Sequence, residues 1–143
     1  MLISSTSVNK LAEYVENRDE VFCSGLFLSA RWMVISQLDR LGIQMIVLPD
    51  RDSAEYCAAD LYHLIEGDRV YFLPDSGKSL ERSNYKSSLG VQRTSAIGKI
   101  LEYKEGEQMI IVTYPSALEE IIPEKGKISG SLLKLAAGDE KPY

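Results

Sequence analysis

The sequence predicts a single α/β domain in which a mostly parallel β-sheet carries helices on both faces. Amphipathic helical segments alternate with short apolar segments along the chain, which is the pattern of strands joined by crossover helices. The apolar segment Ile43–Leu48 is interrupted only by Gln44, as is typical of a strand buried on both faces. A length of 143 residues with 45% hydrophobic residues suits one domain with a sizeable core.

The first third of the chain is predicted as helix, strand and helix. Apolar residues on one side of Ser7–Arg18 predict a short amphipathic helix. Glu20–Gly25 is predicted as the first strand. Apolar residues recur at helical spacing from Trp32 onward, so Ser29–Leu41 is predicted as the second helix, and Gly42 suits the position after its end.

The middle of the chain continues the alternation. Ile43–Leu48 is the second predicted strand. Asp52 or Ser53 can cap a helix that runs to Ile65. Arg69–Leu73 is the third predicted strand.

The next segments are predicted as loop, helix, strand and short helix. Asp75–Leu89 lacks periodicity and is predicted as a loop, whereas Gln92–Lys104 is predicted as a helix. Gln108–Thr113 is the fourth predicted strand, and Ser116–Ile122 follows as a short helix. Ligands of such sheets bind outside the carboxyl ends of the strands. In this chain those ends are predicted at 25–31, 49–52, 74–89 and 114–116.

The segment from Ser24 to Trp32 occupies the position of a phosphate loop but lacks most of its chemistry. A working loop needs a second glycine five residues after the first, followed by Lys and Ser/Thr. This chain keeps Gly25 but has Ala30, Arg31 and Trp32 at those positions, with Leu28 and Ser29 filling the loop. We predict a degenerate phosphate loop that supports no ATP hydrolysis.

Two other interpretations of the same residues stay open. Gly25 can simply form a tight turn, with Arg31 as a solvated helix residue. Alternatively, the helix N-terminus and Arg31 can retain a residual anion site around Gly25, Ser29 and Ala30.

The charge pattern excludes some classes of protein and leaves one candidate strip. The chain has 16 basic and 21 acidic residues, a net charge of −5, which argues against a histone-like DNA binder. Between residues 78 and 93 the local charge is +3, because four basic residues face Glu81 (4 − 1). Lys78, Arg82, Lys86 and Arg93 are therefore candidates for DNA-backbone or partner contacts, with a solvated loop as the alternative.

Metal and disulfide chemistry is not expected. His63 is the only histidine, so a His/Cys zinc site is nearly excluded. Cys23 and Cys57 have apolar neighbours and are predicted to be reduced, buried thiols. Neither a signal peptide nor an apolar segment of membrane-spanning length is apparent, so a cytoplasmic location is expected.

Five stretches, in order and spacing, resemble the N-terminal segment of the bacterial transcription-repair coupling factors (Mfd), which is itself similar to the first domain of UvrB. They are Gly25–Arg31, Ile46–Asp50, Ala59–Tyr62, Val70–Pro74 and Ile111–Leu118. The resemblance spans about Val21 to Pro123, and the form of Phe72–Lys86 looks most like versions from Bacteroides-type bacteria.

The resemblance implies a fold similar to phosphate-loop NTPases and helicases, with a degenerate Walker A loop and no catalytic residues or cofactor. Residues 1–128 would form the UvrB-like domain. Residues 129–143, with a strand-like Leu132–Leu135, would begin the next domain, which in the family contacts UvrA.

The function implied by the resemblance is that of a non-enzymatic scaffold in transcription-coupled nucleotide excision repair. This chain would be an N-terminal fragment that supports UvrA recruitment and autoinhibition of the parent, an ATP-dependent DNA translocase. Its partners would be the other domains of the parent and UvrA through the adjoining domain, whereas DNA and RNA polymerase would be reached only through the parent. The alternatives are an ATP-binding domain and a DNA-backbone-binding module.

Overall fold

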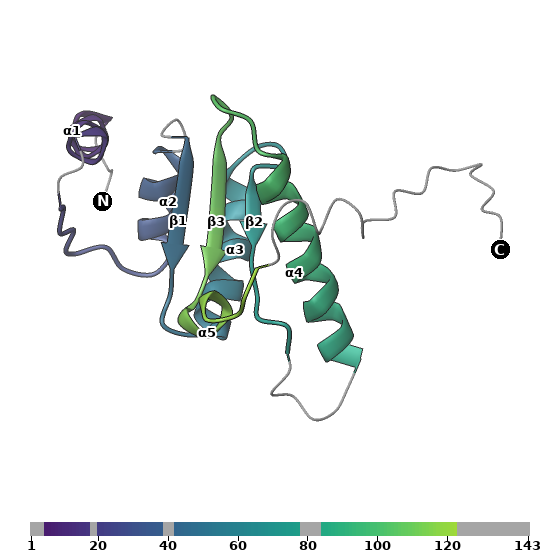
Figure 1. Cartoon of the computed structure of the whole chain (residues 1–143). Helices are drawn as coiled ribbons and strands as arrows, with labels where there is room; N and C mark the ends of the chain where they lie inside the picture. The colour runs from purple at the N-terminus through teal and green to yellow at the C-terminus, as the bar shows by residue number, and fades with distance from the viewer. Residues whose placement is uncertain (1–4, 18–19, 39–41, 78–83, 123–143) are drawn as a thin grey trace, which may run out of the picture.

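Three parallel strands form the centre of the computed structural model, which describes residues 5–17, 20–38, 42–77 and 84–122. The strands are β1 (Ile43–Val47), β2 (Val70–Phe72) and β3 (Met109–Thr113). β3 lies in the middle of the sheet and pairs in parallel with both neighbours, in the order β1-β3-β2. The three carboxyl ends therefore meet at one edge of the sheet, as Figure 1 shows by the arrowheads.

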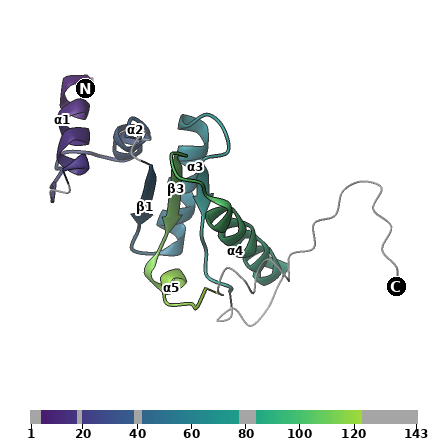
Figure 2. The same ribbon diagram turned by 45° about the horizontal axis from the view of Figure 1, so that its top comes forward.

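Helices cover both faces of this sheet, as predicted. α2 (Ala30–Ser36) and α3 (Arg51–Leu64) lie on one face, and the long α4 (Asn84–Glu102) lies on the other (Figures 1 and 2). The four-residue α5 (Pro115–Leu118) lies at the carboxyl edge. The α/β class is thereby confirmed at the level of a small parallel sheet between helices.

The first helix, α1 (Ser5–Glu16), lies at the far side of α2 from the sheet (Figures 1 and 2). Val8 and Ala12 of this helix bury their side chains against Leu38, which follows α2. This small cluster is separate from the two clusters on the sheet, so α1 contributes little to the main core.

The main core lies between the sheet and α3. Leu61 of α3 packs with Ile110, Val112 and Tyr114, all of them almost fully buried. Trp32 of α2 joins the same cluster with 6% exposure, so the prediction that it is a core residue is confirmed. A second, smaller cluster on the other face includes Ile97 of α4.

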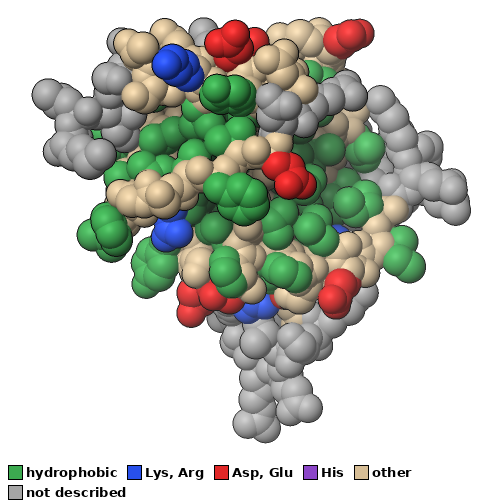
Figure 3. All heavy atoms as spheres, turned by 90° about the vertical axis from the view of Figure 1, so that its left-hand side faces the viewer, with side chains coloured by type: hydrophobic (Ala, Val, Ile, Leu, Met, Phe, Trp, Pro, Cys, Tyr) green, Lys and Arg blue, Asp and Glu red, His purple; other side chains and the backbone are tan. Residues whose placement is uncertain are grey.

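The prediction that β1 is buried on both faces was wrong. Ile43, Met45 and Val47 point to the α4 side of the sheet and are 49%, 54% and 48% exposed. α4 packs over β2 and β3 and does not reach β1, so this apolar strip stays uncovered. Figure 3 shows hydrophobic side chains gathered on the side of the molecule where β1 and the N-terminal elements lie.

The predicted first strand, Glu20–Gly25, is not a strand. The segment has no regular secondary structure and is not part of the three-stranded sheet, and Phe22 is 94% exposed. Alternating apolar residues made it look like a strand, yet a strand needs a ladder partner and a buried face, and this segment has neither in the structure. The described residues therefore contain three strands of the four predicted.

The helices begin and end at other residues than the sequence predicted. α4 starts at Asn84, inside the segment predicted to be a loop. Its buried face places Arg93 between apolar residues such as Leu89 and Ile97, so a polar residue interrupted the hydrophobic period. α2 and α5 end at Ser36 and Leu118, earlier than predicted.

The cap of α3 also differs from the prediction. Asp50, rather than Asp52 or Ser53, is the N-cap, and its carboxylate accepts a 2.8 Å hydrogen bond from the Ser53 backbone N–H. This bond lowers the pKa of Asp50, because it favours the charged form. Gly67, at φ +83°, makes the turn after the helix.

The two cysteines lie in different environments. Cys57 lies on the buried face of α3, and burial raises the pKa of its thiol to about 12. Cys23 is exposed. The prediction that both thiols are buried was therefore wrong for Cys23. None of the described helices is long and apolar enough to cross a bilayer. The proposed domain boundary at residues 128–129 and the strand-like Leu132–Leu135 lie outside the described residues.

The difference in exposure between Cys23 and Cys57 predicts that only Cys23 is alkylated in the folded protein. Iodoacetamide at about pH 8 should label Cys23 in the folded protein and leave Cys57 unlabelled until denaturant is added, because the reactive species is an accessible thiolate. Mass spectrometry of tryptic peptides measures the two sites separately. The variant Cys23→Ser should take up no label when folded. Equal rates at both cysteines would contradict the burial of Cys57.

Candidate functional site

Ligands of parallel α/β sheets bind at the carboxyl edge of the sheet. Three side chains reach this edge from the ends of three different strands. Arg51 begins α3 after β1, Asp75 follows β2, and Tyr114 follows β3 directly. The parallel register therefore brings together residues that are far apart in sequence.

The three side chains bind one another. The Nη2 atom of Arg51 lies 2.9 and 2.8 Å from the two carboxylate oxygens of Asp75, and the Nε atom donates to the Tyr114 hydroxyl at 3.1 Å. The hydroxyl also accepts from the backbone N–H of Asp75 at 3.0 Å, and the Gly77 N–H donates to the Asp75 carboxylate at 2.8 Å. We call Arg51, Asp75 and Tyr114 the edge cluster.

The electrostatics of the edge cluster keep its ions charged. Burial favours the neutral carboxyl of Asp75, but bonds from Arg51, the Gly77 N–H and Tyr114 outweigh it and lower its pKa. The pKa of Arg51 is raised, chiefly by its hydrogen bond to the Tyr114 hydroxyl and also by the Asp75 carboxylate. Burial of the guanidinium lowers this pKa but is outweighed. Burial raises the pKa of Tyr114, which stays a neutral phenol. The arrangement is a mutually satisfied ion pair.

This pairing predicts an acid-sensitive contribution to stability. The Asp75 pKa is lower in the folded than in the unfolded state, where Asp titrates near about 3.9. The contribution is therefore present above about pH 4 and is lost as the pH falls through the lowered folded-state value. Urea titrations from neutral to acidic pH should show a smaller acid loss for Asp75→Asn than for the wild type.

The exposed Asp52, on the first turn of α3, gives the matched control. The variant Asp52→Asn removes a carboxylate without touching the edge cluster. If Asp75→Asn and Asp52→Asn change the acid loss equally, the edge cluster is not its source.

A second group of polar side chains lies beside the edge cluster. Arg93 of α4 is 6% exposed, and its Nη1 atom donates to the carbonyl oxygens of Pro74 at 2.7 Å and Ala117 at 3.1 Å. Its Nε atom lies 3.2 Å from the carboxylate of Glu120. The same carboxylate accepts from the Ser76 hydroxyl at 2.7 Å.

The candidate basic strip is therefore not a continuous free surface. The guanidinium of Arg93 is inside the protein, where it binds protein groups, so a phosphate contact through it would require these bonds to break. Lys78 and Arg82 lie outside the described residues, and of Lys86 only the helical backbone is described.

The side chains of the segment predicted to be a degenerate phosphate loop bind other groups of the protein. The Ser29 hydroxyl donates to the Asp60 carboxylate at 2.8 Å, and the Arg31 guanidinium lies over the Trp32 ring at 4.4 Å. Leu28 has φ +49° and is 84% exposed, a strained conformation for a branched residue. Gly25, at φ +76°, makes the turn expected of it.

Ala30 begins α2, and neither Ser29 nor another side chain provides a cap bond at this helix start. In the part of the chain that the structure describes, no strand leads into the loop, whereas a phosphate loop follows directly from a strand of the sheet. The sequence therefore identified the residues of the loop correctly, but the strand predicted before the loop, Glu20–Gly25, is not formed.

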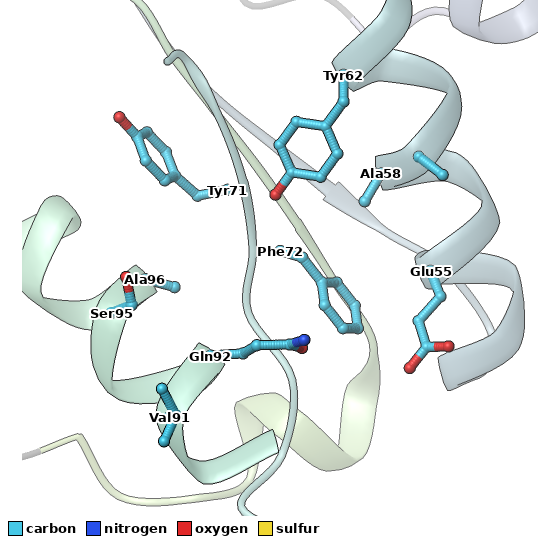
Figure 4. Close-up of a pocket in the computed structure, with 10 residues that line it drawn as sticks. Glu55, Ala58, Tyr62, Tyr71, Phe72, Val91, Gln92, Ser95 and Ala96 are labelled. Atoms are coloured by element: carbon cyan, nitrogen blue, oxygen red, sulfur yellow. The ribbon is translucent and has the colours of Figure 1, made fainter. Parts of the chain in front are cut away.

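A hollow of about 530 Å³ lies between α3 and α4, along the outer edge of β2. Figure 4 shows Tyr62, Phe72 and Gln92 pointing into this space from α3, β2 and α4. The Phe72 backbone N–H, on the unpaired edge of β2, hydrogen bonds to the Tyr62 hydroxyl. The lining of the hollow includes Glu55 and no lysine or arginine, so the hollow does not suit a phosphate group.

Metal ligands do not gather in the described part of the chain, where no group of three His, Cys, Asp or Glu residues is placed to hold an ion. His63 is exposed on α3.

The edge cluster itself was not predicted as a site. The signal was present, because residues of opposite charge follow the ends of β1 and β2 within a few residues of a proline. Pairing them required the strand order, which the sequence does not give.

Comparison with known proteins identifies no relative: no family model, no curated protein and no solved structure matches this chain.

Proposed function

We propose that this chain is a non-enzymatic scaffold and interaction domain of a bacterial transcription-repair coupling factor, with a UvrB-like fold and a degenerate phosphate loop. The support from sequence is the ordered set of stretches from Gly25–Arg31 to Ile111–Leu118. The small parallel sheet with helices on both faces is compatible with this fold.

The observation that carries the proposal is the set of bonds made by the loop. A phosphate loop presents backbone N–H groups and a hydroxyl to an anion. Here the Ser29 hydroxyl instead donates to the carboxylate of Asp60, which repels a phosphate placed beside it. Trp32, at the position of the metal-binding hydroxyl, is buried in the core.

The carboxyl edge supports the same conclusion. Arg51 lies at the carboxyl ends of the strands, and its Nη2 and Nε atoms already donate to Asp75 and Tyr114. A triphosphate would have to break this partly buried ion pair, whose side chains are 21% and 12% exposed, to reach the arginine. A scaffold domain binds no triphosphate, so in that role the ion pair of Arg51 and Asp75 stays intact.

The proposed role in repair is to position the adjoining domain, through which UvrA would be recruited, and to help hold the parent protein in an autoinhibited state. In this role the chain has no ATPase activity of its own, and its contacts are with proteins.

Calorimetric titration of the chain with magnesium and ATP tests the first part of the proposal. We expect no heat of binding in the micromolar range, and the variant Arg31→Ala should give the same trace. Micromolar binding that is lost in Arg31→Ala would overturn the scaffold proposal in favour of a nucleotide-binding domain.

A pull-down with purified UvrA tests the second part. A version extended by one domain should retain UvrA, whereas this chain alone should retain much less. Failure of both versions would contradict the recruitment role. Fluorescence anisotropy with duplex DNA at two salt concentrations is a further check, because strong binding that weakens with salt would favour a DNA-binding module.

A further inference from the structure

The segment Pro115–Ile122 crosses the carboxyl edge of the sheet with little apolar anchorage. It contains α5 and lies beneath the arrowheads of β1 and β3 in Figure 1. Within it, Ala117 alone belongs to the hydrophobic core. Leu118, Ile121 and Ile122 are 43%, 92% and 46% exposed. We call this segment the strap.

Polar bonds hold the strap in place instead. The Arg93 guanidinium donates to the carbonyl oxygens of Ala117 at 3.1 Å and Glu120 at 3.2 Å, and its Nε atom lies 3.2 Å from the Glu120 carboxylate. That carboxylate also accepts from the Ser76 backbone N–H at 3.0 Å and from the Ser76 hydroxyl at 2.7 Å. These bonds of Arg93, Glu120 and Ser76 are the latch.

Two of the three latch residues, Arg93 and Ser76, belong to the body of the domain. Arg93 projects from α4, and its Nη1 atom also donates to the Pro74 carbonyl oxygen at 2.7 Å. Ser76 follows β2 directly after Asp75 of the edge cluster. The body side of the latch would therefore remain in place if the strap moved away.

We propose that the strap is a separable element that opens as a unit when the latch is broken, without unfolding of the sheet. Two features support independent opening: one small core residue costs little to expose, and the polar groups of the latch can be solvated by water once they separate. Opening breaks the 3.5 Å contact between the Ser116 hydroxyl and the Asp75 carboxylate of the edge cluster, at the carboxyl ends of the strands.

Hydrogen exchange of the full chain, measured by mass spectrometry, tests this proposal with the pair Glu120→Ala and Glu119→Ala. Glu119 is the exposed neighbour of Glu120 in the strap, so its variant is a matched control. The reporting amides are those of Ala117 and Leu118, which donate to the carbonyl oxygen of Tyr114 just before the strap, so these bonds are lost when the strap separates from the body. In Glu120→Ala they should exchange about 10- to 100-fold faster, since hydrogen bonds to a charged group are lost.

The expected pattern is local. Peptides from β3 and α3 should keep wild-type exchange in Glu120→Ala, and Glu119→Ala should match the wild type throughout. Unchanged exchange of the strap in Glu120→Ala would overturn the latch. Faster exchange across β3 and α3 as well would show that the strap does not open separately, and would also overturn the proposal. Neither outcome depends on ATP or UvrA binding, so the test is independent of the proposed function.

Discussion

Replacement of Tyr114 by alanine is expected to lower the free energy of unfolding by about 3–5 kcal/mol. The ring is 2% exposed within the main core and lies 6.3 Å from the ring of Phe72, centroid to centroid. Its hydroxyl also accepts hydrogen bonds from Arg51 and from the Asp75 backbone. The variant therefore loses packing and leaves two donors without their partner.

The two losses can be separated. Tyr114→Phe keeps the ring and removes only the hydroxyl, so it should cost about 1–3 kcal/mol. Tyr56, on the outer side of α3, is 76% exposed and gives the control Tyr56→Ala, which should cost less than about 1 kcal/mol. Urea denaturation followed by circular dichroism measures all three. If Tyr114→Ala unfolds no more easily than Tyr56→Ala, Tyr114 is not at the centre of the core.

A second large effect is expected from Leu61→Ala. Leu61 is fully buried on the face of α3 that packs on the sheet, so its removal leaves a cavity and should cost about 2–5 kcal/mol. Leu64 lies three residues later in the same helix and is 42% exposed. Leu64→Ala removes the same atoms from a half-exposed site and should cost about 1 kcal/mol or less.

The comparison of these two leucine variants tests the orientation of α3. Both replacements are Leu to Ala in the same helix, and the difference in helix propensity between these residues is small, so the difference in stability between the two variants chiefly reports burial. Thermal and urea unfolding should rank Leu61→Ala well below Leu64→Ala in stability. The reverse order would mean that α3 presents another face to the sheet.

The sequence predicted the elements whose hydrophobic pattern was complete. Ile43–Leu48 and Gln108–Thr113 read as strands and are strands, because a continuous apolar segment bounded by turn residues has few other stable structures. The helix from Asp52 or Ser53 to Ile65 was also predicted, apart from its cap. In each case the local signal agreed with the tertiary structure.

The failures arose where tertiary contacts decided the structure. Glu20–Gly25 has the alternation of a strand, but the structure gives it no neighbouring strand to pair with. The start of α4 was missed because Arg93 occupies an inward position, and its charge is compensated by Glu120 and backbone carbonyls that only the fold brings near. Polar residues on a buried face are invisible to a pattern based on hydrophobicity.

The site was predicted less well than the fold. The loop residues Gly25, Ser29 and Arg31 do lie together, since they are neighbours in sequence. The edge cluster unites residues separated by as many as 63 positions, and only the strand order places them side by side. Side chains that meet through a sheet register cannot be paired from one sequence without knowledge of that register.

The bare strip on β1 has a practical consequence for handling the isolated chain. Ile43, Met45 and Val47 stand on a strand whose outer edge pairs with no other strand among the described residues, and exposed apolar edge strands are known starting points for aggregation. Concentrated preparations should therefore become turbid sooner than the net charge of −5 would suggest. A single gatekeeper charge, as in Met45→Lys, would be the most economical way to keep such preparations clear.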